Sequence, residues 1–491
     1  MQENYSTDVI IVGAGNAAFS AAVSAKENGA NVLMLEKVDE KYMGGNSALT
    51  IHMRFAYNSF QDLLPLIKFP NSKIELIKFN KKIDTLKEIV TPYTKENYIN
   101  DIDNVTENKS DKKLSKELVN NSLNTIQWMN KLGHFWMPTF ENPTSANVVS
   151  FEGKGFGLIS RWKNIATKMG IQIAYNSPVV DLIKKDNKIC GVIAIQNNKK
   201  VKIFAKSTIL ACGSFESNPQ MRAKYLGNEW KNIKLRGVPH NTGEGLEMAI
   251  NYGAVPYDDW STCHASPQDI NRPEFDLPGK NKSGDYWSRY AYPFSFMINQ
   301  DGNRFVDEGE TWRGLTYAKT GKAIINQKNQ VAYQLFDAKH KKSGVLAKYN
   351  TATKYIANNL EDLLNKIKIE NKNNLLSYID KYNNSINNAN FDPHILDGKS
   401  NLNIQPNRNN WALPLDTPPF EAYPTIAGMT FCYGGIKTTI DGEVVNKNGD
   451  IINGLFAVGE MLGGLWYKNY PSGGGMMAGS VFGKKAGKKA S

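Results

Sequence analysis

The hydrophobic pattern at the start of the chain predicts alternating strand and helix. Residues 8–12 form an apolar run of strand length, and residues 16–28 form an Ala-rich stretch with a helical pattern. Gly29 predicts the end of this helix, and residues 31–35 form a second apolar run that Glu36 closes. Together these segments predict a complete βαβ unit.

Helical and strand-like segments alternate through the following 220 or so residues of the chain. Residues 60–135 are rich in Lys, Asn and helix-forming residues, and they predict mostly helices. A further helix is predicted from residue 241 to near residue 253. Between these regions, Asn and Lys turns separate short apolar runs that predict strands over 171–175, 179–183, 189–195 and 201–204, followed by an apolar run over 208–211.

The amino-acid composition of the chain changes again near residue 260. Trp, Tyr, Pro and His cluster between 260 and 312, and a Lys- and Asn-rich, helix-like region covers about 338–390. Prolines predict loops over 391–425, and the last 65 residues become glycine-rich and strand-like once more. No repeat at a fixed period is present.

The last 65 residues therefore resemble the N-terminal part of the chain in composition. This pattern predicts an α/β protein, α+β overall. A discontinuous, Rossmann-like domain would be formed by residues 1–260 and 428–491, with a helical insertion over about 60–135. A second domain, over 261–427, would interrupt it.

Composition excludes several classes of protein. With 491 residues, 41% hydrophobic and 22% charged, the chain can bury a large core and is not mainly disordered. The formal net charge of +12 favours an acidic partner: a nucleic acid, an anionic membrane surface or a small anion. We expect no nucleic-acid role, because the sequence has no recognisable motif for one and no concentrated basic stripe.

Cysteine spacing and hydropathy bear on metal binding and on membrane insertion. The cysteines at 190, 212, 263 and 432 form no CxxC pair, which predicts no metal site, iron–sulfur cluster or c-type haem. No apolar run reaches the ~18 residues that a membrane span requires. The N-terminal residues contain no basic and apolar leader, so we expect a cytoplasmic chain.

A glycine-rich turn joins the first predicted strand to the first predicted helix. Gly13 permits the tight turn, Gly15 lets the backbone approach a pyrophosphate, and Ala18 lets the helix pack closely on the strand. The helix N-terminus offers free N–H groups to the phosphates. Glu36, 23 positions after Gly13, is placed to accept hydrogen bonds from ribose hydroxyl groups. The alternative is a chance glycine-rich turn in an unrelated α/β protein.

Three further elements favour FAD over NAD as the dinucleotide. Residues 44–47 are Gly-Gly-Asn-Ser, residues 454–460 end in Gly459-Glu460, and residues 471–477 precede a helix-like run to about Gly487. FAD is longer than NAD and needs contacts from such a returning C-terminal segment. Glu460 could hold the ribityl hydroxyl groups, and the helix after Ser472 could direct N–H groups at the flavin O2.

The predicted cofactor-binding residues come from all of these elements. They are Gly13, Gly15, Asn16, Ala17, Ala18, Glu36, Lys37, Gly44, Gly45, Asn46, Ser47, Val180, Ala211, Gly213, Glu244, Gly459, Glu460, Ser472, Gly475 and Met476.

At these residues the chain resembles the flavoprotein family of fumarate reductases, succinate dehydrogenases and ketosteroid dehydrogenases. The resemblance covers almost the whole chain, and within the family it is greatest to tricarballylate dehydrogenase flavoproteins. It implies a mobile capping domain over an FAD-binding domain, with the flavin at their junction. The motifs that carry it lie at 12–15, 36–37, 44–50, 210–213, 241–245, 302–309, 313–319, 454–460 and 469–475.

Three departures from the family pattern bear on cofactor and substrate. The covalent histidine of membrane-bound succinate dehydrogenases has no counterpart at residues 44–47, so we expect non-covalent FAD. Fumarate reductases resemble this chain but carry a His-His pair where Thr430-Phe431 stands here. They also carry an Asn-Arg pair, whose arginine clamps a carboxylate, where Asn469-Tyr470 stands. The last two departures put fumarate itself in doubt.

The implied chemistry is oxidation of a C–C bond beside a carboxylate. A base removes the proton alpha to the carboxylate, a hydride leaves for flavin N5, and cationic donors hold the carboxylate. By resemblance, Arg313 is the proton-shuttling arginine and His264 a substrate-binding histidine. Because arginine is normally always protonated, a base role would require a relay through Glu308 or Asp307. Further candidates for substrate contact are His52, Arg54, Arg289, Tyr467 and Tyr470.

Each assignment has a structural alternative. Arg313 could clamp a carboxylate with no proton role, His264 could be a core histidine, and Arg54 a surface ion-pair residue. The aromatic cluster at 260, 286, 287, 290 and 292 could line a ligand cavity or form the core of the cap.

The sequence therefore predicts an FAD-dependent enzyme that acts on a small polycarboxylate, most like tricarballylate dehydrogenation to cis-aconitate. One alternative is a fumarate-reductase-like or enone and unsaturated-acid reductase, and another is a non-catalytic flavin-binding redox subunit. Electrons would pass to or from an external partner protein or quinone. By resemblance to the tricarballylate system, that partner is a membrane-bound iron–sulfur protein, which would place the cytoplasmic chain at the inner face of the membrane.

Overall fold

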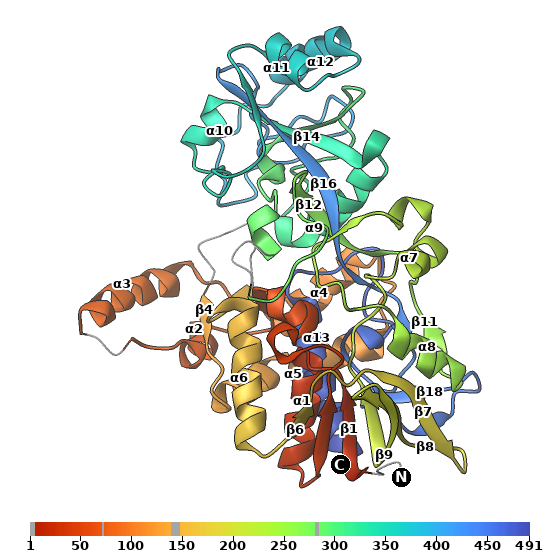
Figure 1. The fold of residues 1–491 in the computed structure, drawn as a ribbon. Coiled ribbons are helices and arrows are strands. Elements are labelled where there is room, and N and C mark those ends of the chain that lie inside the picture. Colours follow the sequence, from red (N-terminus) through yellow and green to blue (C-terminus); the bar gives the residue numbers. More distant parts are fainter. Residues whose placement is uncertain (1–4, 71–72, 139–147, 280–283) are drawn as a thin grey trace.

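The computed structural model describes residues 5–70, 73–138, 148–279 and 284–491. Two sheets dominate this part of the chain, one near each end of the molecule in Figure 1. The first sheet carries the N-terminal βαβ unit, and the second lies around the long strand β16 (Phe420–Cys432).

The first sheet has a parallel centre. In the described chain its strand order is β18-β19-β9-β1-β2-β6, with β7 and β8 added beside β9. The pairs β19–β9, β9–β1, β1–β2 and β2–β6 are parallel, while β7, β8 and β18 are antiparallel to their neighbours. The strands are β1 (Tyr5–Val12), β2 (Val32–Leu35), β6 (Gln172–Ala174), β7 (Val179–Lys185), β8 (Lys188–Gln196), β9 (Lys199–Leu210), β18 (Glu443–Val445) and β19 (Ile451–Ala457).

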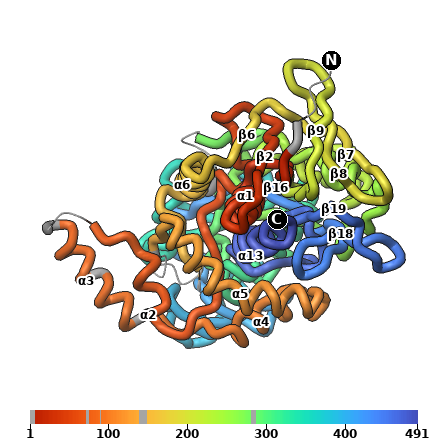
Figure 2. Tube along the Cα trace, turned by 90° about the horizontal axis from the view of Figure 1, so that it is seen from below, coloured from red at the N-terminus to blue at the C-terminus, as the bar shows by residue number. Residues whose placement is uncertain are grey.

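The two ends of the chain pack together beside this sheet. Helix α1 (Asn16–Glu27) lies against helix α13 (Gly474–Ala490), as Figure 2 shows from below. Glycines on α13 permit the close approach, because a Cβ atom would lie 2.5 Å from the Ala17 carbonyl oxygen at Gly483 and 2.2 Å from that of Ala21 at Gly487. The C-terminal segment is therefore part of the N-terminal βαβ layer.

Helices of the predicted 60–135 insertion cover the neighbouring side, and α3 projects from the body of the molecule (Figure 1). A small antiparallel sheet of β3, β5 and β4 joins this region to α6. The elements are β3 (His52–Arg54), α2 (Phe60–Leu63), α3 (Lys73–Ile89), α4 (Lys95–Val105), α5 (Lys112–Lys131), β4 (Trp136–Pro138), β5 (Val148–Phe151) and α6 (Lys154–Lys168).

The second sheet has β16 as its central strand and its own hydrophobic cores. Five strands of the described chain pair in its path or beside it: β10 (Lys234–Leu235), β12 (Cys263–Asp269), β13 (Phe296–Asn299), β14 (Val331–Phe336) and β15 (Tyr355–Ala357). This sheet draws β10 from before residue 260, and β16 extends past residue 428. The domain boundaries at 260 and 428 remain predictions.

The remaining described elements connect the two sheets or cover the second one. They are α7 (Pro219–Tyr225), α8 (Glu244–Asn251), β11 (Pro256–Tyr257), α9 (Arg313–Ile325), α10 (Ala338–Lys342), α11 (Leu360–Lys366), α12 (Lys372–Asn384) and β17 (Gly435–Ile436). In the part of the chain that the structure describes, no helix is both long and apolar enough to cross a membrane.

The structure confirms the predicted βαβ unit, the helices of the 60–135 region and the C-terminal helix. Two expectations were wrong in detail. The runs at 201–204 and 208–211 form one strand, β9, because β8 pairs with its first half and β1 and β19 pair with its second half. Residues 420–425, predicted as loop from their prolines, begin β16. Pro424 is tolerated there because it lies one residue beyond the last pair with β12, Asp269 with Thr425.

Candidate active site

The glycine-rich turn after β1 forms one end of a large cavity. Gly13 has a φ of 110°, and a Cβ atom there would lie 2.6 Å from the Ala211 carbonyl oxygen, so only glycine fits. Gly15 is the N-cap residue of α1, and its side of the turn opens onto the cavity. The turn therefore brings the N-terminus of α1 to the cavity at the carboxyl end of the parallel strands.

Three ionisable side chains, those of Glu36, Lys37 and Glu244, border this end of the cavity. Glu36 follows β2, and its Oε1 accepts a hydrogen bond from the Val38 N–H at 3.1 Å. Burial raises the pKa of the Glu36 carboxyl. Lys37 Nζ lies 3.0 Å from Glu244 Oε1 and donates to Thr242 Oγ1 at 2.9 Å. The ion pair connects the end of β2 to the start of α8.

The Gly44–Ser47 turn is tied to three other parts of the chain through its polar side chains. Ser47 Oγ accepts a hydrogen bond from the Asn16 N–H at 3.1 Å. Asn46 Nδ2 donates to Glu216 Oε1 at 2.8 Å and to the Thr430 carbonyl oxygen at 2.7 Å. These bonds fix the Gly44–Ser47 turn, which lines the cavity, between the first sheet and the end of β16.

The N-terminus of α13 reaches the same cavity from the other end of the chain. Ser472, Gly473, Gly475 and Met476 line it. The Ser472 N–H donates to the Gly314 carbonyl oxygen at 2.9 Å, which connects α13 to the start of α9. Arg54 Nε donates to the Ser472 carbonyl oxygen at 2.7 Å. Two helix N-termini, those of α1 and α13, therefore open onto one cavity.

The structure gathers most of the predicted cofactor residues around this cavity. Ala18 of α1 does not line the cavity and is fully buried. Its small side chain allows the helix to pack closely on the sheet. Val180 is 39% exposed and does not line the cavity, whereas its neighbour Val179 does. The predicted residues that line it are Gly13, Gly15, Asn16, Ala17, Glu36, Lys37, Gly44, Gly45, Asn46, Ser47, Ala211, Gly213, Glu244, Gly459, Glu460, Ser472, Gly475 and Met476.

These residues fit an extended dinucleotide such as FAD. Its pyrophosphate would lie at the α1 N-terminus, and a ribose beside the carboxyl of Glu36. The cavity is also lined by Glu460 and by residues at the N-terminus of α13, which lie outside the N-terminal βαβ unit. Gly213, which lines the cavity, has a φ of 77°, and a Cβ atom there would lie 2.8 Å from the Asn241 side chain, so the position favours glycine.

Aromatic side chains surround the end of the cavity that lies between the two sheets. The rings of Tyr290 and Tyr317 meet edge to face with centroids 5.8 Å apart, and those of Phe431 and Tyr470 meet in the same way at 4.9 Å. The Tyr317 and Tyr470 hydroxyl groups are hydrogen-bonded to each other. Burial raises the pKa of both phenols, so both stay protonated at neutral pH. We call Tyr290, Tyr317, Phe431, Tyr433, Trp466 and Tyr470 the aromatic wall.

Two arginines share this end of the cavity. Arg313 is the first residue of α9, and its guanidinium lies 4.9 Å from the centroid of the Tyr290 ring. The Arg236 guanidinium lies 5.9 Å from the same centroid, and its Nη1 donates to Thr430 Oγ1 at 3.2 Å. His52 also lines the cavity. The positive charges and the aromatic wall therefore face one space.

His264 lies behind the aromatic wall. It is fully buried on β12, with its ring centroid 4.6 Å from that of Tyr317 and 5.0 Å from that of Tyr470. Neither ring nitrogen has a hydrogen-bond partner among the described residues. Burial, and then the charge of Arg236, lowers the pKa of His264 well below its ordinary value. The imidazole is therefore neutral, and it supports the wall from a position outside the cavity lining.

The structure places three other predicted substrate residues away from the cavity. Arg54 is buried, and its Nη1 donates to Tyr93 Oη at 2.8 Å and pairs with Asp101 Oδ2 at 3.1 Å. Arg289 is buried in an ion pair with Asp269 inside the second sheet region. Tyr467 accepts a hydrogen bond from Lys109 Nζ at 3.0 Å on its hydroxyl oxygen. Of the substrate candidates, the cavity brings together Arg313, His52 and Tyr470.

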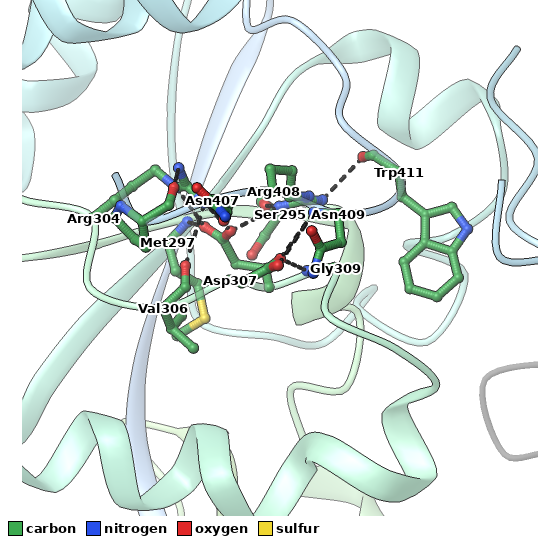
Figure 3. A network of polar contacts seen from close by, with 12 residues as sticks. Ser295, Met297, Arg304, Val306, Asp307, Gly309, Asn407, Arg408, Asn409 and Trp411 are labelled. Carbon is green, nitrogen blue, oxygen red and sulfur yellow. Dashed lines mark hydrogen bonds and ion pairs between the residues drawn. The ribbon is translucent and has the colours of Figure 1, made fainter. Parts of the chain in front are cut away.

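The two carboxylates suggested as a proton relay to Arg313, Glu308 and Asp307, are held in a separate network of polar contacts. Figure 3 shows this network around Asp307, Arg304 and Arg408. Glu308 lies between Arg304, at 2.7 Å, and Arg408, at 3.0 Å. Burial alone would raise the pKa of Glu308, but the two arginines more than offset this effect and lower it. Asp307 accepts the backbone N–H of Gly309 at 2.9 Å, and burial raises its pKa to about 6. This network fixes the chain just before Arg313.

Several residues of the site had no clear signal in the sequence. Arg236, Tyr317, Tyr433, Trp466 and Glu216 lie near the cavity only because β9, α9, β16 and the segment before α13 converge there. Tyr317 stands four residues after Arg313 on α9, a spacing that places both on one face of the observed helix. In the sequence, Tyr317 stood out only as part of the 313–319 motif that carries the family resemblance, without a role of its own.

Comparisons with known proteins agree with this geometry. A family model described as FAD binding domain matches residues 8–50 and 94–476. The probable fumarate reductase Ifc3 of Shewanella frigidimarina is 26% identical over 494 residues, covering 99% of this chain and 74% of that protein. The NADH:fumarate oxidoreductase of Klebsiella pneumoniae is 25% identical over 504 residues, covering 99% of this chain and 48% of that protein.

The fold also matches a solved structure. The open conformation of a flavocytochrome c3 fumarate reductase superimposes with a TM-score of 0.72 at 24% identity, covering 99% of this chain and 78% of that one. This likeness supports the fold alone. The chain spans about half the length of the Klebsiella protein and about three quarters of the Shewanella protein, so both relatives carry segments beyond the matched part.

Proposed function

We propose, from the premise that this chain belongs to the FAD binding domain family, that it reduces the C=C bond of a small unsaturated carboxylate. The observation that carries the proposal is the meeting of Arg313, Arg236 and the aromatic wall at the flavin end of one cavity. FAD is the cofactor, and when bound it supplies the hydride of a two-electron reduction.

The arginines of the cavity would bind the substrate carboxylate, stabilise negative charge and provide a proton. A guanidinium binds a carboxylate through two parallel N–H donors and stabilises the negative charge that develops as the double bond is reduced. The reduction also consumes one proton at the carbon alpha to the carboxylate. Because arginine side chains normally carry their proton, an arginine at this position suits the role of proton donor better than that of base, which favours the reductive direction over dehydrogenation.

The number of arginines and the aromatic wall together indicate what kind of substrate the cavity accepts. Among the described residues that line the cavity, the arginines are Arg236 and Arg313, while Arg54 and Arg289 pair elsewhere with carboxylates. Two arginines match one carboxylate, or at most two, rather than the three of tricarballylate. Flat apolar rings favour a planar, conjugated substituent at the other end of the molecule. We therefore favour an unsaturated monocarboxylate over the tricarballylate expected from the sequence.

A second candidate is an enone substrate. Tyr470 and Tyr317 present a pair of buried, protonated hydroxyl groups to the cavity, and such donors suit a neutral carbonyl oxygen. An enone would need this pair and not the arginines.

The experiment that tests the proposal is a panel of oxidants for the reduced protein. The holoprotein is reduced without oxygen and mixed with cinnamate, crotonate, fumarate, cis-aconitate or a 3-ketosteroid enone, and flavin absorbance is followed. We expect cinnamate or crotonate to reoxidise the flavin fastest. Fastest reoxidation by cis-aconitate would restore the polycarboxylate assignment, and by the steroid the enone assignment. If none reoxidises the flavin, the chain is a redox subunit without a substrate of its own.

Electrons must reach the flavin from outside the described chain. Its four cysteines are free, and no group of three or more His, Cys, Asp or Glu side chains among the described residues could hold a metal ion. The relatives of greater length carry additional segments, and the name of one includes NADH as its reductant. We propose that a separate redox protein or a quinone reduces this chain.

A further inference from the structure

Two carboxyl groups, those of Glu216 and Glu460, face each other at one side of the cavity. Glu216 follows β9 and is 0% exposed, and Glu460 follows β19 and lines the cavity. Their side chains lie within hydrogen-bonding reach of one another. Two ionised carboxylates at such a distance repel each other strongly in a buried site. A neutralising partner or a shared proton is therefore needed.

The hydrogen bonds around the pair leave one position for a proton. Glu216 Oε1 accepts from Asn46 Nδ2 at 2.8 Å and from Asn241 Nδ2 at 2.5 Å. Glu460 Oε2 accepts from the Ser214 N–H at 3.2 Å. Glu216 Oε2 is buried and contacts no donor in the described chain. An O–H group on Glu460 would satisfy this oxygen, which is otherwise costly to leave unpaired.

No ion pair joins either carboxyl group to a cation within the described residues. Arg222 lies close, but its Nη1 donates to the Glu216 backbone carbonyl at 2.6 Å and its Nη2 to that of Lys231. The Cys263 and Cys432 thiols also face the pair, and burial raises their pKa values, so they carry no charge at neutral pH. Burial raises the pKa of Glu216 to about 7, and burial with the charge of Glu216 raises that of Glu460.

We infer that Glu216 and Glu460 hold one proton between them, and that Glu216 is a positioning residue which keeps this cofactor-facing pair at a single negative charge. The pair titrates as a unit, with the proton belonging to neither residue alone. The function of the pair follows from its position beside the cavity that would hold FAD. FAD brings two phosphate charges into the cavity, and a second carboxylate charge would add to the negative charge there and weaken binding, whereas a carboxyl O–H can also donate a hydrogen bond. The inference rests on FAD binding and not on the proposed reaction.

The test is infrared spectroscopy of the full-length holoprotein in H2O and D2O. A protonated carboxyl group has a C=O stretch that is separate from carboxylate bands and shifts on deuteration. Spectra of Glu216→Gln and Glu460→Gln are subtracted from that of the unchanged protein at a pH about one unit above neutral, where Asp307 and Asp258, with pKa values of about 6, are ionised. Glutamine has the same shape and can donate to the remaining carboxylate, so both variants should fold and keep their yellow colour.

We expect each difference spectrum to contain the same single carboxyl band, because the introduced glutamine no longer repels the remaining carboxyl group and donates a hydrogen bond that favours its ionised form. The exposed Glu247→Gln on α8 is the matched control and should show no band. Two results would overturn the inference: absence of a carboxyl band from both difference spectra, or a band lost in one variant only. A failure of every substrate in the oxidant panel leaves this measurement unaffected, so the two proposals fail separately.

Discussion

The side-chain amide of Asn16 is hydrogen-bonded to Ser480, a residue 464 positions later in the chain, with Nδ2 and Oγ 2.8 Å apart. The same nitrogen donates to the Met476 carbonyl oxygen at 3.0 Å, and Asn16 Oδ1 accepts from Trp162 Nε1 at 2.9 Å. Asn16 is the first residue of α1 and lines the cavity. One buried side chain thus joins the start of α1, at the cavity, to the C-terminal helix.

The first prediction concerns this junction. Asn16→Ala leaves the Trp162 N–H and the Ser480 hydroxyl without their buried partner, which should lower the free energy of unfolding by roughly 2–4 kcal/mol and reduce FAD content. Ser480→Ala removes one of the three bonds and should cost about 1 kcal/mol. Urea unfolding of the purified proteins measures both. Equal stability of Asn16→Ala and the unchanged protein would contradict this account of the junction.

The second prediction concerns the contact between α1 and α13. At Gly483 a Cβ atom would lie 2.5 Å from the Ala17 carbonyl oxygen and 3.0 Å from Ser20 Cβ. Gly483→Val should therefore separate the two helices, cost roughly 1–3 kcal/mol or more, and release FAD. Lys488→Ala, on the exposed face of the same helix, is the control and should change neither property. Unfolding midpoints and flavin absorbance per chain measure the effect, and a yellow, stable valine variant would contradict the packing described.

Sequence patterns could predict the parts of this molecule that depend on neighbours in the chain. The βαβ unit follows from hydrophobic periodicity, and the turn at Gly13 follows from a backbone conformation that glycine alone adopts easily. The glycine clusters before α13 and after β19 predicted a dinucleotide longer than NAD, and the family match supports FAD.

What the sequence could not predict depends on pairs far apart in the chain. The place of Arg54 after a glycine-rich turn suggests a substrate contact, but Asp101 and Tyr93 hold its guanidinium in the interior. Asp269 holds Arg289 in the same way. An isolated arginine in a sequence gives no sign of which carboxylate will meet it. The aromatic wall likewise combines residues from separate segments, and β9 places Glu216 beside Glu460 across 244 positions.

A third prediction tests the hydroxyl pair in the aromatic wall. Tyr470→Phe keeps the ring that packs on Phe431 and removes the hydroxyl that bonds to Tyr317. If that hydroxyl contacts the substrate, kcat/KM should fall about 10- to 100-fold, the cost of one hydrogen bond to a charged group. Steady-state kinetics with the best oxidant of the panel measures it. Tyr355→Phe, an exposed tyrosine of β15, controls for the substitution, and equal kcat/KM in both variants would exclude a substrate role for Tyr470.

A fourth prediction concerns pH and stability. The pKa of Glu216 is raised by burial to about 7 from an ordinary value of 4.5, so the folded state binds its proton more tightly than the unfolded state. The stability that this group contributes is complete below about pH 4.5 and is lost as pH rises through about 7. The loss should be on the order of 2–4 kcal/mol.

Glu216→Gln should lack this dependence. The comparison between the two proteins matters, because His134, whose pKa burial lowers to about 3, makes both less stable as pH falls. Denaturant unfolding at several pH values, expressed as the difference between unchanged protein and variant, removes the His134 contribution and leaves that of the Glu216–Glu460 pair. A difference that stays constant with pH would contradict the raised pKa.

The most direct test of the central claim is anaerobic reoxidation of the reduced flavin by an unsaturated carboxylate, measured for the unchanged protein and for Arg313→Lys. Lysine keeps the positive charge but loses the planar pair of donors. We expect the unchanged protein to be reoxidised, and the variant, with FAD still bound, to react at least about 100-fold more slowly. Lys319→Ala, on the same helix, should react at the unchanged rate. Equal rates with Arg313→Lys, or no reoxidation of the unchanged protein by any unsaturated acid, would contradict the account.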